Sequence, residues 1–213
     1  MIKFFIDGGP FMYVIALLSI LAFAMVLEKY FALTFSYPFR RNFFGKVVKS
    51  VRERNISGAA KMCRSTGHPL AAVISEILRN YDQSMETIES ASGLCIQKLI
   101  PKIQKRTYLI QVTGNISMLF GLLGTIQGLI TSFSSLSGAD AATKAEILAN
   151  GISTAMNTTA FGLIVAIPCI VAYAMLANKE SSILQKYDET INEILHIIEH
   201  EHADRSSSRS KAA

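Results

Sequence analysis

The chain has 213 residues, of which 50% are hydrophobic and only 17% are charged, with a mean hydropathy of +0.34. Soluble domains usually carry about 25% charged residues, so this composition counts against a soluble enzyme and against a disordered chain. The three cysteines are an odd number at wide spacings, which excludes a disulfide scaffold and indicates free thiols: Cys63, Cys95 and Cys169.

The N-terminal part of the chain predicts a short outer segment followed by a membrane span. Residues 1–10 end in a Gly-Gly-Pro turn. Residues 11–27 carry no charge, and about 20 apolar residues cross the hydrocarbon core of a bilayer, so we assign the first span to residues 11–35. The basic cluster follows this apolar run instead of preceding it, and no small-x-small cleavage site is present, so a cleaved signal peptide is not expected.

Residues 36–106 predict a cytoplasmic region built from short helices. Asn55 and the residues after it predict a helix cap, with the next helix over residues 59–65. The first helix of the region is indicated by apolar residues at helical spacing with Arg and Lys between them: Phe43, Phe44, Val47, Val48 and Val51.

Two further helices are predicted before the second span. Residues 70–80 place apolar side chains on one face, and another helix begins near Ser84 and leads towards the second span. His68 precedes Pro69 in a turn with no second metal ligand nearby, so we expect a surface histidine there.

The second half of the chain predicts two long helices. Residues 107–137 and 147–178 lie in uncharged stretches, and each is long enough to cross the bilayer and continue into the cytoplasm. Residues 138–146 are expected to form an outer loop, and residues 179–204 an amphipathic cytoplasmic helix. The polar tail, residues 205–213, is expected to be disordered. The fold class is therefore an all-α integral membrane protein with three transmembrane helices.

The basic residues indicate the orientation of these spans. Most of the 21 Lys and Arg lie in residues 40–106 and after residue 178, and positive residues stay on the cytoplasmic side of a membrane. We therefore expect an inner-membrane protein with an outer, periplasmic N-terminus and a cytoplasmic C-terminus. The net charge of +5 reports this topology and does not indicate nucleic-acid binding.

Catalytic and metal-binding patterns are weak. The segment from His196 to His200 matches the H-x-x-E-H pattern of one group of zinc proteases. A catalytic zinc usually needs three protein ligands and a pocket, whereas this segment is expected to be the solvated end of a helix. We expect no enzyme activity, no metal and no cofactor.

The second and third spans carry small and polar residues at helical spacing. Small residues let helix backbones approach closely in lipid, and uncharged polar groups in a membrane usually face a bundle interior or a water-filled path. Pro168 is expected to bend the third span. The candidate packing residues include Gly114, Ser117, Gly121, Gly124, Gly128, Gly151 and Gly162, and the candidate polar path comprises Asn115, Thr125, Thr154, Asn157, Thr158 and Thr159.

Neither of these two long spans contains an acidic residue. No carboxylate lies between Glu89 and Asp140, and none lies between Glu146 and Glu180. Proton transport generally needs a titratable group partway across the membrane. If the chain conducts protons, a partner must therefore supply the carboxylate.

Two segments resemble the MotA/TolQ/ExbB proton-channel proteins. Residues 119–133, LFGLLGTIQGLITSF, resemble the second-span motif of that family, and residues 151–168, GISTAMNTTAFGLIVAIP, resemble the third-span motif. The stretch containing Cys63 and Pro69-Leu70 is similar to the family's cytoplasmic region. Three spans with a modest loop resemble ExbB and TolQ more than the four-span MotA.

The resemblance implies a pentameric ring in the inner membrane around two single-span partners of the ExbD/TolR/MotB type. Each partner helix would carry an Asp through which protons flow, so that the proton motive force drives work at the cell envelope. The family's channel threonines correspond to Thr125 and Thr159. Under this hypothesis the glycine stripe would offer the partner a smooth contact surface.

This chain departs from the family at one channel position, and a different class of function remains open. Thr154 stands where ExbB and TolQ often have Glu, and Thr158 is an additional hydroxyl. The alternative hypothesis is a non-conducting membrane scaffold, in which the stripe only packs helices and the threonines bond to their own backbone carbonyls.

Overall fold

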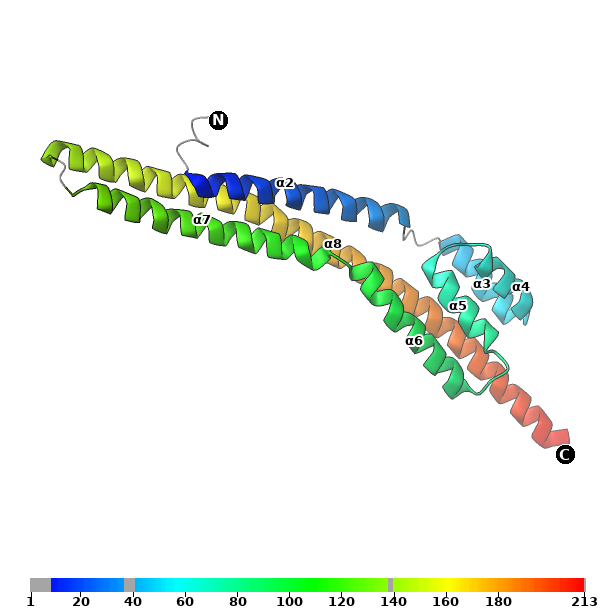
Figure 1. Cartoon of the computed structure of the whole chain (residues 1–213). Coiled ribbons are helices and arrows are strands. Elements are labelled where there is room, and N and C mark those ends of the chain that lie inside the picture. Colours follow the sequence, from blue (N-terminus) through cyan, green and yellow to red (C-terminus); the bar gives the residue numbers. More distant parts are fainter. Residues whose placement is uncertain (1–8, 37–40, 138–139, 213) are drawn as a thin grey trace. The chain divides into compact units, whose positions relative to one another are not determined.

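The computed structural model describes residues 9–36, 41–137 and 140–212. Every regular element in this part of the chain is helical. In chain order the elements are α2 (Pro10–Phe31), a π-helical turn (Ala32–Ser36), α3 (Arg41–Arg52), α4 (Ile56–Arg64), α5 (Pro69–Arg79), α6 (Met85–Gln104), α7 (Thr107–Ser135) and α8 (Ala141–Ala212) (Figure 1).

Within the described residues, three helices are long and apolar enough to cross a membrane, which confirms the predicted fold class. They lie in the segments Pro10–Phe35, Met85–Ser135 and Thr143–Ala203. The chain is therefore a multi-pass membrane protein.

The chain folds as two compact units. The first unit comprises Met1–Tyr30 and Arg106–Ala177, and the second comprises Phe31–Lys105 and Asn178–Ala213. Helix α8 contributes residues to both units, because its chain runs from Ala141 to Ala212 without interruption.

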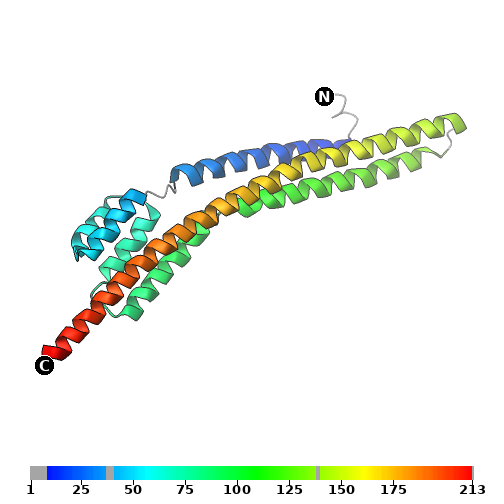
Figure 2. The same ribbon diagram turned by 180° about the vertical axis from the view of Figure 1, so that it is seen from behind.

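Helices α2, α7 and the first half of α8 form the first unit. Figures 1 and 2 both show α7 lying antiparallel to α8, with α2 alongside them. Met12 and Ile15 of α2 are fully buried, whereas Ile20, Leu119 and Ile164 are 59–70% exposed. Large apolar side chains therefore cover the outside of this unit, as expected for helices that face lipid.

Helices α3 to α6 and the second half of α8 form the second unit. Their apolar faces meet in one core, which includes Phe44, Val47, Cys63, Leu70, Ile74, Ile77, Ile88, Tyr187, Ile191, Ile194 and Ile198. Two of the helix starts carry the side-chain caps that their sequences favour. Asn55 accepts a hydrogen bond from the Gly58 N–H, and Ser84 accepts one from the Thr87 N–H.

Ionic contacts also hold α8 in the second unit. Glu201 is only 8% exposed; it accepts a hydrogen bond from the Tyr81 hydroxyl and lies 3.4 Å from the Arg54 Nε. His202 Nε2 lies 2.8 Å from the Tyr81 carbonyl oxygen and donates to it. These contacts anchor this part of α8, which the sequence predicted as an amphipathic helix.

The prediction of a surface histidine at position 68 was wrong. His68 is only 9% exposed, and its Nδ1 caps α5 by accepting a hydrogen bond from the Leu70 N–H. Its other ring nitrogen lies 3.3 Å from the Tyr187 hydroxyl, and its ring packs edge-on against Phe44. The turn that precedes Pro69 is covered by α8, which is distant in the sequence.

The predicted element bounds differ from the structure at both ends of α8. The helix begins at Ala141, inside the predicted loop 138–146, and continues to Ala212, through the tail that was expected to be disordered. No Gly or Pro interrupts the chain after Pro168, so no residue there breaks the helix. Of the predicted outer segment 1–10, all but Gly9 and Pro10 lies outside the described residues, as do positions 138 and 139 of the loop.

Candidate functional site: the seam between α7 and α8

Helices α7 and α8 are in backbone contact where their glycines meet. A Cβ placed on Gly162 of α8 would lie 2.9 Å from the Ser117 carbonyl oxygen and 3.1 Å from the Gly121 Cα. A Cβ on Gly121 would lie 3.3 Å from the Thr159 Cα. Only glycine at these positions permits this approach. We call this contact, from Gly114 to Ser132 on α7 and from Gly151 to Cys169 on α8, the seam.

Small residues continue the seam in both directions. A Cβ on Gly114 would lie 2.8 Å from the Cys169 Cβ, and one on Gly128 would lie 3.2 Å from the Ala155 Cβ. Towards the loop, a Cβ on Gly151 would collide with the Ser132 side chain. Nearly the whole small-residue stripe of α7 therefore faces α8 of the same chain.

This packing corrects the expectation that the glycine stripe forms a surface for a partner. Gly114, Gly121, Gly124 and Gly162 are buried within the chain. The stripe is covered because α8 carries matching small residues at the same helical period. The glycine stripe itself therefore offers no free surface to another protein.

Three of the predicted channel threonines cluster at the seam. The Thr159 hydroxyl donates across it to the Gly121 carbonyl oxygen, 3.0 Å away. The Thr158 hydroxyl donates to the Thr154 carbonyl oxygen at 2.9 Å, and the Thr125 hydroxyl donates to the Leu122 carbonyl oxygen at 2.6 Å. The Thr125 and Thr159 hydroxyls each donate their proton in these bonds, so their oxygens keep lone pairs that can accept a further hydrogen bond.

The polar residues divide between the two edges of the seam. At 100° per residue, Thr125 and Thr159 fall on one side of the glycines that make the contact. Thr154 falls on the other side, where its methyl carbon lies 4.0 Å from the Cβ position of Gly9, just before α2. Thr158 lies between them and is fully buried. Thr125 and Thr159 therefore share the edge that is remote from the start of α2.

The remaining predicted residues do not join this cluster. Asn115 is exposed and lies ten residues before Thr125, which is about 15 Å along the helix. Asn157 is half-buried on the side of α8 that carries Thr154. Pro168 lies partway along α8, and its side chain is exposed. These residues contribute to other surfaces of the first unit.

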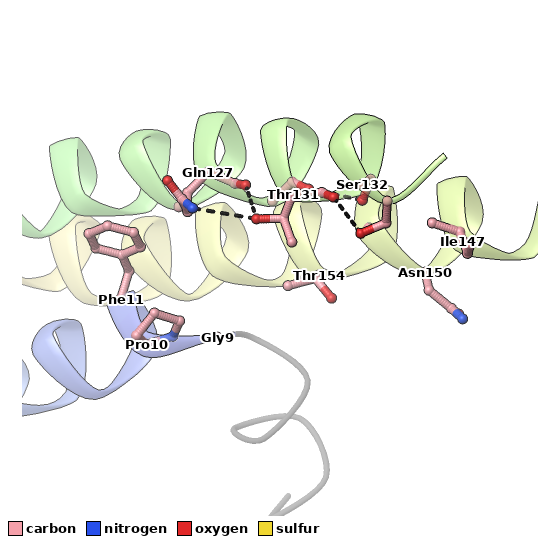
Figure 3. Close-up of a pocket in the computed structure, with 13 residues that line it drawn as sticks. Gly9, Pro10, Phe11, Gln127, Thr131, Ser132, Ile147, Asn150 and Thr154 are labelled. Atoms are coloured by element: carbon pink, nitrogen blue, oxygen red, sulfur yellow. Dashed lines mark hydrogen bonds between the residues drawn. The ribbon is translucent and has the colours of Figure 1, made fainter. Parts of the chain in front are cut away.

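A pocket of about 420 Å³ lies on the Thr154 edge (Figure 3). Its walls come from α7, α8 and the residues that begin α2. The hydroxyl and amide groups of these spans are evident from the sequence, whereas nothing in the sequence of Gly9, Pro10 and Phe11 points to a contact with α8. The full lining is Gly9, Pro10, Phe11, Gly124, Gln127, Gly128, Thr131, Ser132, Ser135, Ile147, Asn150, Gly151 and Thr154.

The acidic residues described in the first unit lie away from the seam threonines. Glu28 pairs with Arg106 at 2.7 Å, and both side chains are exposed. Asp140 and Glu146 flank the start of α8. The seam therefore presents neutral hydrogen-bonding groups, and a titratable group would have to come from outside this cluster.

Comparison with known proteins identifies the family. Residues 65–189, more than half of the chain, match the MotA/TolQ/ExbB proton channel family. The chain belongs to this family. The matched region includes α7 and most of the described part of α8, and therefore the whole seam.

Individual relatives of this family member are named as biopolymer transport proteins or as Tol-Pal system proteins. The putative biopolymer transport protein ExbB-like 3 of Synechocystis is 31% identical over 150 residues, which cover 70% of this chain and 71% of that protein. Biopolymer transport protein exbB1 of Vibrio cholerae is 32% identical over 112 residues, or 53% of this chain and 48% of exbB1. The Tol-Pal system protein TolQ of Haemophilus influenzae is 34% identical over 108 residues, or 51% of this chain and 47% of TolQ. The chain thus spans about half the length of exbB1 and of TolQ.

Proposed function

We propose that this chain is the ring-forming subunit of a proton channel in the bacterial inner membrane. Its partner would be a dimer of single-span proteins of the ExbD/TolR/MotB type, each with an Asp in its membrane helix. The ring would be a homopentamer with the N-terminus of each subunit outside and the C-terminus in the cytoplasm. The complex would use the proton motive force to power envelope work such as TonB-type transport, Tol-type maintenance, gliding or secretion.

The observation that carries this proposal is the pairing of Thr125 and Thr159 on one edge of a seam without acidic residues. A carboxylic acid at mid-membrane costs about 2.5–3.5 kcal/mol on insertion scales. The free lone pairs of the two hydroxyl oxygens can accept a hydrogen bond from a protonated partner Asp or from its water. Neutral hydroxyls therefore lower the cost of placing the partner's acid there without competing for its proton.

The rigid attachment of Thr159 supports the same proposal. Its hydroxyl donates to the Gly121 carbonyl oxygen, so the oxygen is held in one position at the narrowest point of the seam. A fixed acceptor is preorganised for a proton donor and needs no reorientation when the donor arrives.

The test is proton flux through vesicles that contain this chain together with a single-span partner of the proposed type. Thr159→Val keeps the side-chain shape and removes the hydroxyl, whereas Thr159→Ser keeps the hydroxyl. We expect Thr159→Val to assemble with the partner but to lose proton flux, and Thr159→Ser to retain most of it. Thr113→Val is the control, because the Thr113 hydroxyl donates to the Leu109 carbonyl oxygen of its own helix, twelve residues before Thr125 on α7 and outside the threonine cluster. Wild-type flux in assembled Thr159→Val would overturn the proposal.

A non-conducting scaffold is the second candidate, and one observation favours it. The Thr125 and Thr158 hydroxyls bond to carbonyls of their own helices, and the glycine stripe is used in packing within the chain. These are the features that a purely structural role requires. Proton flux in vesicles containing both proteins would exclude the scaffold, whereas a partner without a transmembrane Asp would favour it.

A further inference from the structure

We infer that the pocket at the start of α2 is a water-filled vestibule, open to the outer side of the membrane, that hydrates Thr154 (Figure 3). We call it the outer vestibule. The direction of its opening rests on the proposed function and topology, but its hydration is tested separately from proton conduction.

The lining of the outer vestibule has the chemistry of a water site. None of its 13 residues is charged, so it is not built to bind an ion of either sign. Its volume of about 420 Å³ has room for several molecules of water, each of which occupies about 30 Å³ in the liquid. The residues that offer hydroxyl or amide groups are Gln127, Thr131, Ser132, Ser135, Asn150 and Thr154.

Two of these side chains have hydrogen-bonding capacity that the protein leaves unused. Thr131 and Ser132 each donate to a carbonyl of α7, at 2.9 Å. In contrast, the side chains of Thr154 and Asn150 make no hydrogen bond within the described residues. They lie one turn apart along the α8 wall (Figure 3). Because a half-buried hydroxyl without a partner is costly, water is the simplest partner for Thr154.

The position of the pocket along the helices gives it access to water. Helix α2 begins at Pro10, beside the pocket, and its apolar stretch marks where the hydrocarbon core starts. From Gly124, at the inner end of the pocket, α7 continues to Ser135, which is about 16 Å further. The pocket therefore lies at the level where α2 begins and the α7–α8 hairpin projects beyond it.

The outer vestibule lies next to the buried part of the seam. Gly124 lines the pocket, and a Cβ on this residue would collide with the Thr158 methyl group. The Thr158 hydroxyl donates to the carbonyl oxygen of Thr154, whose side chain lines the pocket. Water in the vestibule would thus lie within one helical turn of Thr158, and the next residue is Thr159. An acyl chain in the same space would leave Thr154 and Asn150 without partners in hydrocarbon, which is unfavourable.

Cysteine accessibility tests this inference in the full chain, expressed with its partner in intact cells. The background carries Cys63→Ala, Cys95→Ser and Cys169→Ala, and the probe is a membrane-impermeant trimethylammonium methanethiosulfonate added from outside. The test positions are Thr154→Cys in the pocket and Asn150→Cys at its rim. Ile164→Cys on the exposed apolar face of α8 and Ala155→Cys in the buried seam are the matched controls.

We expect Thr154→Cys to react at least about ten times faster than Ile164→Cys, because only the thiolate reacts and it forms only where water reaches the thiol. Reaction at Asn150→Cys but not at Thr154→Cys would show that the pocket is dry below its rim and would overturn the inference. No reaction with the probe at either position in a correctly inserted protein would also overturn the inference. If Thr154→Cys is labelled but the wild-type complex shows no proton flux, the proposed function is refuted, whereas the inference of a hydrated vestibule still holds.

Discussion

Replacing Gly162 with alanine is expected to force α7 and α8 apart at their closest approach. The new methyl carbon would lie 2.9 Å from the Ser117 carbonyl oxygen and 3.1 Å from the Gly121 Cα. Carbon atoms normally pack about 3.5–4.0 Å apart. The atoms that it meets belong to the backbone, so no side-chain rotation relieves the overlap.

The magnitude follows from two opposing effects. Overpacking of this kind costs about 1–3 kcal/mol, whereas alanine gains about 0.8–1.0 kcal/mol over glycine inside a helix. Gly93→Ala is the matched control, because Gly93 lies inside α6 and a Cβ there meets nothing within 4 Å. The control receives only the propensity gain. Gly162→Ala should therefore be about 1–3 kcal/mol less stable than Gly93→Ala.

The assay is thermal unfolding of the two purified variants in the same detergent, followed by far-ultraviolet circular dichroism. We expect Gly162→Ala to unfold at a lower temperature than Gly93→Ala, and Gly93→Ala to match or exceed the wild type. Equal midpoints for the two variants would refute the backbone contact at Gly162, and with it the fixed position that we assign to Thr159.

Three further predictions concern the second unit. Tyr81→Phe removes a hydrogen-bond donor to the buried Glu201 carboxylate and should lower the free energy of unfolding by about 1.5–3 kcal/mol. Thermal unfolding measures this loss, and an unchanged midpoint would contradict the contact. Burial raises the pKa of the Cys63 thiol to about 11, so a maleimide at pH 8 should label the half-buried Cys95 first and reach Cys63 only on unfolding. Equal labelling rates of the two cysteines in the folded protein would argue against the burial of Cys63. His68→Ala removes the cap of α5 and should lower the free energy of unfolding by about 0.5–2 kcal/mol, whereas His68→Asn should restore most of that loss. Equal stability of these two variants would show that the cap is unimportant.

Much of the fold could be predicted from the sequence because it depends on local composition. The long apolar stretches predict the spans directly, since about 20 apolar residues are needed to cross a bilayer. The cap at Asn55 and the helix start near Ser84 follow from side chains that bond to N–H groups three residues away. The absence of acids from the two long spans is also a property of the sequence alone. These features involve neighbours in the chain or the surrounding solvent.

The identity of each residue's partner depended on the tertiary structure. Helical spacing placed the glycines and threonines on common faces, but α8 decides that the stripe is covered and that Thr159 bonds to Gly121. His68 looked exposed in its turn and is buried because Tyr187 of α8 lies against it. The pocket at Thr154 exists because Pro10, far away in the sequence, closes one side of it. Periodicity along one helix shows which side chains share a face, whereas the element that covers that face is determined only when distant segments pack together.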